Sequence, residues 1–304
     1  MTNGYINWQF IKICLLGLLV SGCASTPNAP SSNFAGEELN DKALDVLFAT
    51  EFPVESKTDA TARAAKALKK GELNKSLFFY VRALQFEPED VELLAQIGEI
   101  HMRRNDLMMA KRAFMMARHY DPNHAQSLEA LGLIYMSEGK DEQAIPELSS
   151  AVANNSQLWR AHNALGVYAD KTGDFAAAQR HYDAALAIEP DAAHVLNNRG
   201  YSKFLAGDAD GAAVDFYEAA NNQGFSQAWA NLGRVYAKQG RYDEAIDTYK
   251  QIMSEAHAYN NAGNAAMENG DFAAAKAYLL EAIRLSPTYF PTAEKNLLSL
   301  KNRN

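Results

Sequence analysis

Residues 226–250 read SQAWANLGRVYAKQGRYDEAIDTYK. Apolar side chains recur at spacings of three and four on both sides of Gly240, which is the pattern of two amphipathic helices. A glycine between them can adopt the positive φ that ends a helix. Gly233 in the first half and Ala245 in the second are small enough to let the two helices pack closely. The stretch therefore predicts a helical hairpin.

The same pattern recurs along the chain. A glycine column, with steps of 34, 34, 34, 33 and 30 residues, runs through Gly98, Gly132, Gly166, Gly200, Gly233 and Gly263. An alanine column accompanies it at Ala110, Ala144, Ala178, Ala212, Ala245 and Ala275. Four residues after each alanine stands an aromatic residue or leucine, at Phe114, Leu148, Tyr182, Phe216, Tyr249 and Leu279. A period near 34 residues predicts stacked helical hairpins.

These columns resemble the tetratricopeptide repeat (TPR), over about three quarters of the chain. Within residues 226–250 the signature positions of that family hold Trp229, Leu232, Gly233, Tyr236, Gly240, Ala245 and Tyr249. The resemblance implies an all-α fold, a TPR solenoid whose hairpins form a right-handed superhelix. About seven hairpins fit into residues 57–289, and residues 290–304 are expected to form a capping helix.

The N-terminal residues have the layout of an export signal. Within residues 1–22, Lys12 precedes an apolar run too short to span a bilayer as a mature helix, which is typical of a secretory signal peptide. The following Val-Ser-Gly-Cys sequence, residues 20–23, resembles a bacterial lipobox. We therefore predict a lipoprotein with Cys23 as the lipidation site, an uncleaved anchor or ordinary signal being the alternative. Ala24 is not the aspartate that retains many lipoproteins at the inner membrane, which favours the outer membrane, on its periplasmic face.

Residues 23–56 are expected to connect the lipid to the repeats. The segment 24–35 is rich in Pro, Ser and Asn, a composition that suits a flexible tether. Residues 37–48 carry apolar side chains at helical spacing, which predicts a lone leading helix. Without the signal peptide the chain has 28 Lys and Arg against 37 Asp and Glu, a net charge of about −9. This acidic body argues against a nucleic-acid partner.

The sequence contains no recognisable catalytic or metal-binding motif. We find neither a phosphate-binding glycine loop nor an HExxH motif, and the seven histidines show no paired spacing. No segment outside the repeats exceeds about 56 residues, too few for an ordinary catalytic domain. The chain is therefore predicted to be a binding protein and not an enzyme, with no cofactor and no metal site. An enzyme with a repeat domain is the distant alternative.

In TPR proteins the first helix of each hairpin lines a concave groove. The corresponding positions make these residues peptide-groove candidates: Arg160, Asn163, Asn197, Asn198, Tyr201, Asn231, Arg234, Lys238, Asn260 and Asn264. An asparagine amide both donates and accepts, so it can pair with the backbone of an extended peptide. Tyr201 and Phe204 would add an apolar pocket. The alternative is that the asparagines space neighbouring helices. Thr61 stands where carboxylate-gripping members of the family have lysine, which argues against that clamp.

The stretch Trp159–Ala220 resembles the TadD family of tight-adherence, or Flp pilus, assembly lipoproteins. The resemblance rests on the short sequences AHNALGV, VLNNRGY and LAGD. It implies a pilotin-like scaffold whose protein partner is a secretin or another pilus-assembly component. Two alternatives stay open, a type IV pilus pilotin and an adaptor that recruits peptidoglycan hydrolases or proteases.

Overall fold

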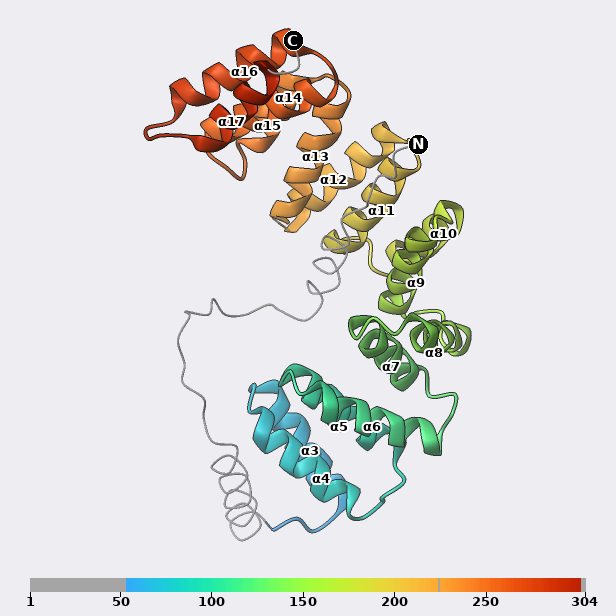
Figure 1. Cartoon of the computed structure of the whole chain (residues 1–304). Helices are drawn as coiled ribbons and strands as arrows, with labels where there is room; N and C mark the ends of the chain where they lie inside the picture. The colour runs from blue at the N-terminus through green and yellow to red at the C-terminus, as the bar shows by residue number, and fades with distance from the viewer. Residues whose placement is uncertain (1–52, 224, 302–304) are drawn as a thin grey trace. The chain divides into compact units, whose positions relative to one another are not determined.

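The structure is a computed structural model that describes residues 53–223 and 225–301, and every regular element in those ranges is an α-helix (Figure 1). The predicted all-α fold class is thus confirmed. The predicted signal peptide, Cys23, the tether and the leading helix lie outside the described residues. The chain divides after Ala164 into two compact units, within helix α9 (Trp159–Thr172).

Unit 1 contains three complete helical hairpins. Their helices are α3 (Lys57–Lys69), α4 (Leu73–Leu84), α5 (Val91–Arg103), α6 (Leu107–Tyr120), α7 (Ala125–Ser137) and α8 (Asp141–Asn154). Each odd-numbered helix packs against the following even-numbered one, and α4 and α6 also contact the first helix of the next hairpin. Consecutive hairpins therefore stack in chain order.

Unit 2 repeats this arrangement. Its helices after α9 are α10 (Phe175–Ile188), α11 (Ala193–Leu205), α12 (Ala209–Gln223), α13 (Ser226–Lys238), α14 (Tyr242–Tyr249), α15 (Glu255–Glu268), α16 (Phe272–Leu285) and α17 (Pro291–Lys301). The last helix, α17, packs against α15 and α16 and buries Ala293 and Leu300. It covers the end of the last hairpin.

The hairpin of α13 and α14 shows why the columns exist. Gly240, between α13 and α14, has a φ of +78°, and the next residue donates its backbone N–H to the carbonyl of Tyr236 over 2.9 Å. A Cβ atom on Gly233 would lie only 2.5 Å from the ring of Tyr249. The glycine column is therefore the space into which the side chain of the second helix fits.

The same contact recurs in every hairpin that has the glycine. The facing pairs are Gly98 and Phe114, Gly132 and Leu148, Gly166 and Tyr182, Gly200 and Phe216, Gly233 and Tyr249, and Gly263 and Leu279. All six residues of the alanine column are completely buried. The expected close approach of the helices is confirmed, and the aromatic or leucine side chain packs within its own hairpin.

The first hairpin keeps the geometry with different residues. Ala64 replaces the glycine and is fully buried, and Ser76 replaces the column alanine. The Ser76 hydroxyl donates to the carbonyl oxygen of Ala64 over 2.9 Å, so its burial leaves no unpaired hydroxyl. Tyr80 stands in the aromatic position and is buried. The first hairpin therefore forms although it lacks the glycine and the alanine of the two columns.

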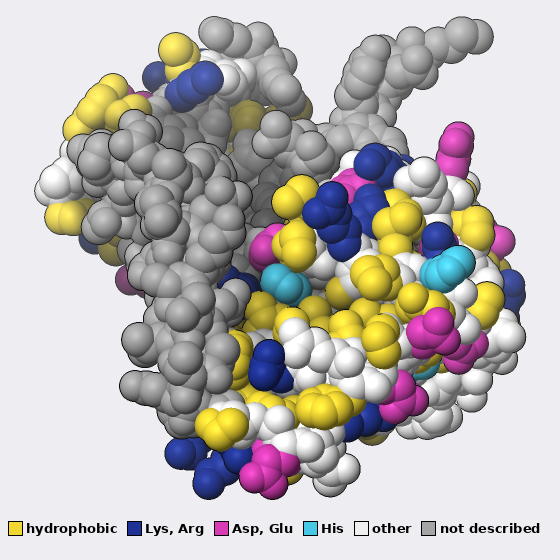
Figure 2. All heavy atoms as spheres, turned by 90° about the horizontal axis from the view of Figure 1, so that it is seen from below, with side chains coloured by type: hydrophobic (Ala, Val, Ile, Leu, Met, Phe, Trp, Pro, Cys, Tyr) yellow, Lys and Arg dark blue, Asp and Glu magenta, His cyan; other side chains and the backbone are white. Residues whose placement is uncertain are grey.

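Unit 1 also exposes large apolar side chains. Figure 2, seen from below, shows hydrophobic side chains gathered among Lys and Arg side chains on the near face. The exposed large apolar residues of unit 1 are Val81, Phe86, Met108, Met115, Met116 and Tyr120. Within residues 53–223 and 225–301, no helix has the length and apolar character needed to cross a membrane.

Candidate functional site

The first helices of successive hairpins in unit 2 are neighbours. α11, α13, α15 and α17 contact one another in that order. Five predicted groove residues on them keep at least part of their surface accessible, namely Tyr201, Asn231, Arg234, Lys238 and Asn264. We call the surface that carries these five residues the first-helix face.

Several predicted groove asparagines bridge neighbouring helices. The Asn231 amide donates to the Asn197 amide oxygen over 2.8 Å, which joins α13 to α11. Asn296 on α17 donates to the amide oxygen of Asn260 on α15 over 3.0 Å. Asn197 is only 2% exposed and Asn260 6%. These two amides are therefore largely enclosed between the helices that they connect.

Asn163 and Asn198 are buried as well. The ten predicted residues thus divide into four buried asparagines and six accessible side chains, the sixth being Arg160 in unit 1. A bound peptide could touch the accessible group directly. It could touch the buried group only where an amide edge reaches the surface.

The first-helix face carries two cations one helical turn apart. Arg234 and Lys238 on α13 are both exposed, and neither has an ion-pair partner among the described residues. Burial raises the pKa of Tyr249, beneath this part of α13, to about 12, and the positive charge of Arg234 acts in the opposite direction. Asn264 on α15 donates to the Glu268 carboxylate over 2.9 Å. An anionic group could therefore pair with α13 without displacing an existing ion pair.

The aromatic pair predicted beside the asparagines belongs to the packing between helices. Tyr201 and Phe204 on α11 are partly buried against a cluster that includes Phe216 on α12 and Leu232 on α13. Both side chains keep part of their surface accessible.

Unit 2 contains a carboxylate cluster that no sequence motif reveals. Asp170 accepts hydrogen bonds from the Tyr182 hydroxyl over 2.7 Å and from the Ser202 hydroxyl over 2.5 Å. Burial raises the pKa of Asp170, and the two hydrogen bonds oppose that rise. The cluster ties α9, α10 and α11 together within unit 2. Tyr182 belongs to the aromatic column of the repeats, and only the structure reveals that its hydroxyl has a partner.

A second polar network lies beside it. The Arg199 guanidinium contacts both oxygens of Asp215, at 2.9 and 2.7 Å, and also Asp183 at 2.8 Å. Lys203 adds a contact of 2.8 Å to Asp215, whose side chain is 1% exposed. Desolvation lowers the pKa of Arg199, but its two carboxylate partners outweigh this and raise the pKa overall. The network joins α10, α11 and α12 by charge-assisted hydrogen bonds.

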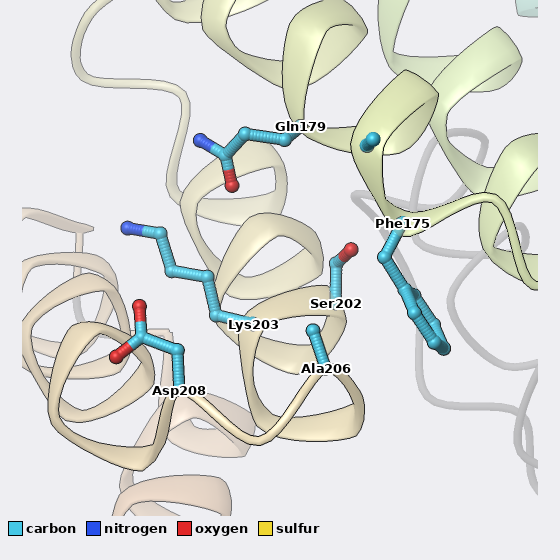
Figure 3. Close-up of a pocket in the computed structure, with 7 residues that line it drawn as sticks. Phe175, Gln179, Ser202, Lys203, Ala206 and Asp208 are labelled. Carbon is cyan, nitrogen blue, oxygen red and sulfur yellow. The ribbon is translucent and has the colours of Figure 1, made fainter.

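A shallow hollow adjoins this network (Figure 3). Its lining includes Phe175, Gln179, Ser202, Lys203 and Asp208. Both Ser202 and Lys203 already bind carboxylates, so they offer little to a ligand. None of the predicted groove residues lines it.

In unit 1 the predicted residue Arg160 is exposed and lies over the Trp159 ring, 5.3 Å from its centroid. Glu129 on α7 accepts a hydrogen bond from the backbone N–H of Ala161 over 3.0 Å. Burial raises the pKa of Glu129, and the charge of Arg160 opposes this. Glu129 occupies a groove position of its hairpin, but it was not among the predicted groove residues.

Among the residues that the structure describes, no three or more His, Cys, Asp or Glu side chains form a group that could hold a metal ion.

Comparisons with known proteins agree with the repeat assignment. Tetratricopeptide-repeat family models match residues 96–158, 163–226, 226–254 and 256–289, which together make up more than half of the chain. Protein FlbA of Caulobacter vibrioides is 23% identical over 192 residues, which are 62% of this chain. The chain spans only 32% of the length of FlbA.

Two solved structures share the fold. The APC/C heterotetramer Cut9-Hcn1 superposes with a TM-score of 0.54 and 21% identity, covering 85% of this chain and 51% of that one. PilF of Pseudomonas aeruginosa superposes with a TM-score of 0.53 and 19% identity, covering 71% of this chain and 99% of that one. With the repeat matches and the hairpin geometry, the conclusion is that the chain belongs to the tetratricopeptide-repeat family.

Proposed function

We propose that the chain is a scaffold for protein partners, and that its first-helix face binds an extended, carboxylate-bearing peptide segment. The observation that carries this proposal is the pair of exposed cations, Arg234 and Lys238, next to the amide bridge of Asn231 and Asn197. The Asn231 side chain donates one amide hydrogen to Asn197, so its amide oxygen and its second amide hydrogen can pair with a peptide backbone. The cations would hold a carboxylate by charge-assisted hydrogen bonds.

Peptide binding tests this directly. The probes are fluorescent extended peptides of one sequence with a glutamate, a glutamine or a lysine at a central position, measured by anisotropy. We expect the glutamate peptide to bind most tightly, and we expect the Arg234→Ala, Lys238→Ala double variant to lose that preference. The matched control is Lys276→Ala, an exposed lysine on the second helix α16. Equal binding of the three peptides, or equal losses in both variants, would refute the assignment.

The asparagines need a separate variant because some are buried. Replacing Asn197, Asn231 and Arg234 together by alanine is expected to weaken capture of a partner while the helix content stays intact. Asn231→Ala alone removes the accessible amide and leaves the enclosed Asn197 in place. If only the triple variant loses binding and helix content falls with it, the asparagines act through the packing of the helices.

We further propose that the partner is a secretin or another component of tight-adherence (Flp) pilus assembly, with TadD as the model. The likeness of Trp159–Ala220 to that family supports this proposal. The fold match to PilF is compatible with it but concerns the fold alone. Cross-linking in the native host, followed by identification of the linked protein, tests it. A type IV pilus secretin, a peptidoglycan hydrolase or a protease in its place would favour one of the alternatives.

Finally, we propose that Cys23 carries a lipid and that the chain is anchored at the periplasmic face of the outer membrane. The support is the lipobox-like sequence and Ala24 after it. Cells fed radiolabelled palmitate should label the wild-type chain and not Cys23→Ala. Membrane fractionation should place the label in the outer membrane. A label that persists in the variant would disprove the anchor.

A further inference from the structure

Two second helices of this chain have complementary charges. Helix α6 in unit 1 carries Lys111, Arg112, Arg118 and His119 and no acidic residue. Helix α12 in unit 2 carries Asp210, Asp215 and Glu218 and no basic residue. Other described helices also carry charge of a single sign, but among these helices α6 and α12 are the two that expose more than one large apolar side chain.

Both helices also expose large apolar side chains. On α6, Met108 is 67% exposed, Met115 42% and Met116 47%. On α12, Val214 is 57% exposed and Tyr217 55%. Such exposure at neighbouring positions of one helix side is typical of a surface that binds another protein. Methionine is flexible enough to adapt its packing to a facing helix.

The exposed residues follow the same spacing on the two helices. Arg112, Met116 and Tyr120 stand four residues apart along α6, and all three are exposed. Glu218, Val214 and Asp210 stand four residues apart along α12 in the opposite direction, and they are exposed too. Residues four apart lie on the same side of a helix. An antiparallel pairing of the two helices therefore places three residues of one opposite three of the other.

That register gives three favourable contacts. In this register Arg112 would face Glu218, Met116 would face Val214, and the Tyr120 hydroxyl would face the Asp210 carboxylate. Neither Arg112 nor Glu218 has an ion-pair partner among the described residues, whereas Lys111 and Arg118 pair with Glu138 and Glu147. The register thus brings together an arginine and a glutamate that both lack an ion-pair partner, while Asp210 on α12 accepts a hydrogen bond from Gln239 over 2.9 Å.

We propose that α6 of one copy of this chain docks antiparallel on α12 of a second copy. The charge complementarity selects a second copy as the occupant, because the chain itself supplies both surfaces. A contact of one helix with another buries less area than a standard stable interface. The association is therefore weak and rises with protein concentration.

Disulfide trapping in cells tests this with the full-length chain. One tagged copy carries Met116→Cys, and a second copy with a different tag carries Val214→Cys. Mild oxidation should give a mixed dimer that contains both tags. The matched control replaces Met116→Cys by Ser150→Cys, an exposed position in the same register on α8. Copies with neither substitution measure any background from Cys14 and Cys23.

Charge exchange provides the decisive measurement. Arg112→Glu on the Met116→Cys copy is expected to lower the mixed dimer about fivefold, because it places two carboxylates face to face. Glu218→Arg on the other copy should lower it similarly against a wild-type α6. The two substitutions together, one on each copy, should restore the dimer. All of these side chains are exposed, so circular dichroism and thermal unfolding should match the wild type.

Three results would overturn the proposal. The Met116 and Val214 pair could trap no more dimer than the Ser150 control pair. The exchanged charges could fail to restore the dimer. The Met116→Cys copy could instead be trapped on an unrelated protein, which would identify a different occupant of α6.

Discussion

The contact between Gly233 and Tyr249 offers the sharpest test of the packing. A Cβ atom on Gly233 would lie 2.5, 2.7 and 2.9 Å from three atoms of the Tyr249 ring. The ring is buried and rigid, so Gly233→Ala must push the two helices apart. Overpacking of this kind costs about 1–3 kcal/mol. Alanine is more favourable than glycine inside a helix by about 1 kcal/mol, which offsets part of this cost.

Removal of the ring should therefore reverse the effect of the methyl group. Tyr249→Ala alone should destabilise the chain by about 3–5 kcal/mol, since the ring is 5% exposed. In that background Gly233→Ala meets no ring, and only the gain of about 1 kcal/mol from helix propensity remains. The change in unfolding free energy caused by Gly233→Ala should thus differ by about 1–3 kcal/mol between the wild type and Tyr249→Ala, and this difference is the coupling between the two positions.

Urea unfolding followed by the fluorescence of Trp229 measures this coupling. Trp229 lies on α13 with Gly233, and Trp8 and Trp159 are replaced by phenylalanine in all variants. A local probe is needed because repeat arrays need not unfold in one step. Tyr249→Phe is the control, since it keeps the ring and should leave the cost of Gly233→Ala unchanged. A coupling below about 0.5 kcal/mol would show that the ring does not require the glycine.

Three further predictions concern the polar groups of unit 2. Asp215→Ala should lower the free energy of unfolding in urea by about 3–5 kcal/mol, because it leaves Arg199 and Lys203 without their buried partner. Asp183→Ala, at an exposed pair, should lower it by at most about 1 kcal/mol in the same experiment. Burial raises the pKa of Asp170, so the folded state favours the protonated carboxyl more than the unfolded state does. The stability of the wild type relative to Asp170→Asn should therefore increase as the pH falls from 7 through the pKa of Asp170 in the folded state. A difference in stability that does not change with pH would contradict this. Asp271→Ala should cost about 1 kcal/mol in thermal unfolding, because its carboxylate caps α16 by accepting from the Ala274 N–H over 3.0 Å, and no loss would show that the cap is dispensable.

Much of the hairpin geometry is readable from single positions in the sequence. Gly240 predicted a turn because glycine tolerates positive φ, and its φ is +78°. Gly233 and Ala245 predicted a close helix pair because only small side chains permit one. The first hairpin shows the limit of such reading. Ser76 broke the alanine column, and the hydrogen bond to Ala64 that makes it fit depends on a carbonyl of the other helix.

The candidate site was less predictable. Its positions came from the family pattern, but the pattern does not say which side chains stay accessible. Asn197 and Asn231 occupy similar places on successive first helices, yet Asn197 is enclosed and Asn231 is not. No motif links Asp170, Ser202 and Tyr182 to one another, because they come from three helices that only the packing of the hairpins brings together.

The repeated helical hairpins can be predicted from the sequence, because helical periodicity and a column of small residues are local features that recur about every 34 residues. Which polar groups form hydrogen bonds inside the array, and which stay accessible to a partner, depends on how the hairpins pack. The physical reason is that burial and hydrogen bonding depend on side chains from neighbouring hairpins. Arg234 and Lys238 stay free, whereas Asp215 is enclosed by two cations from the preceding helix.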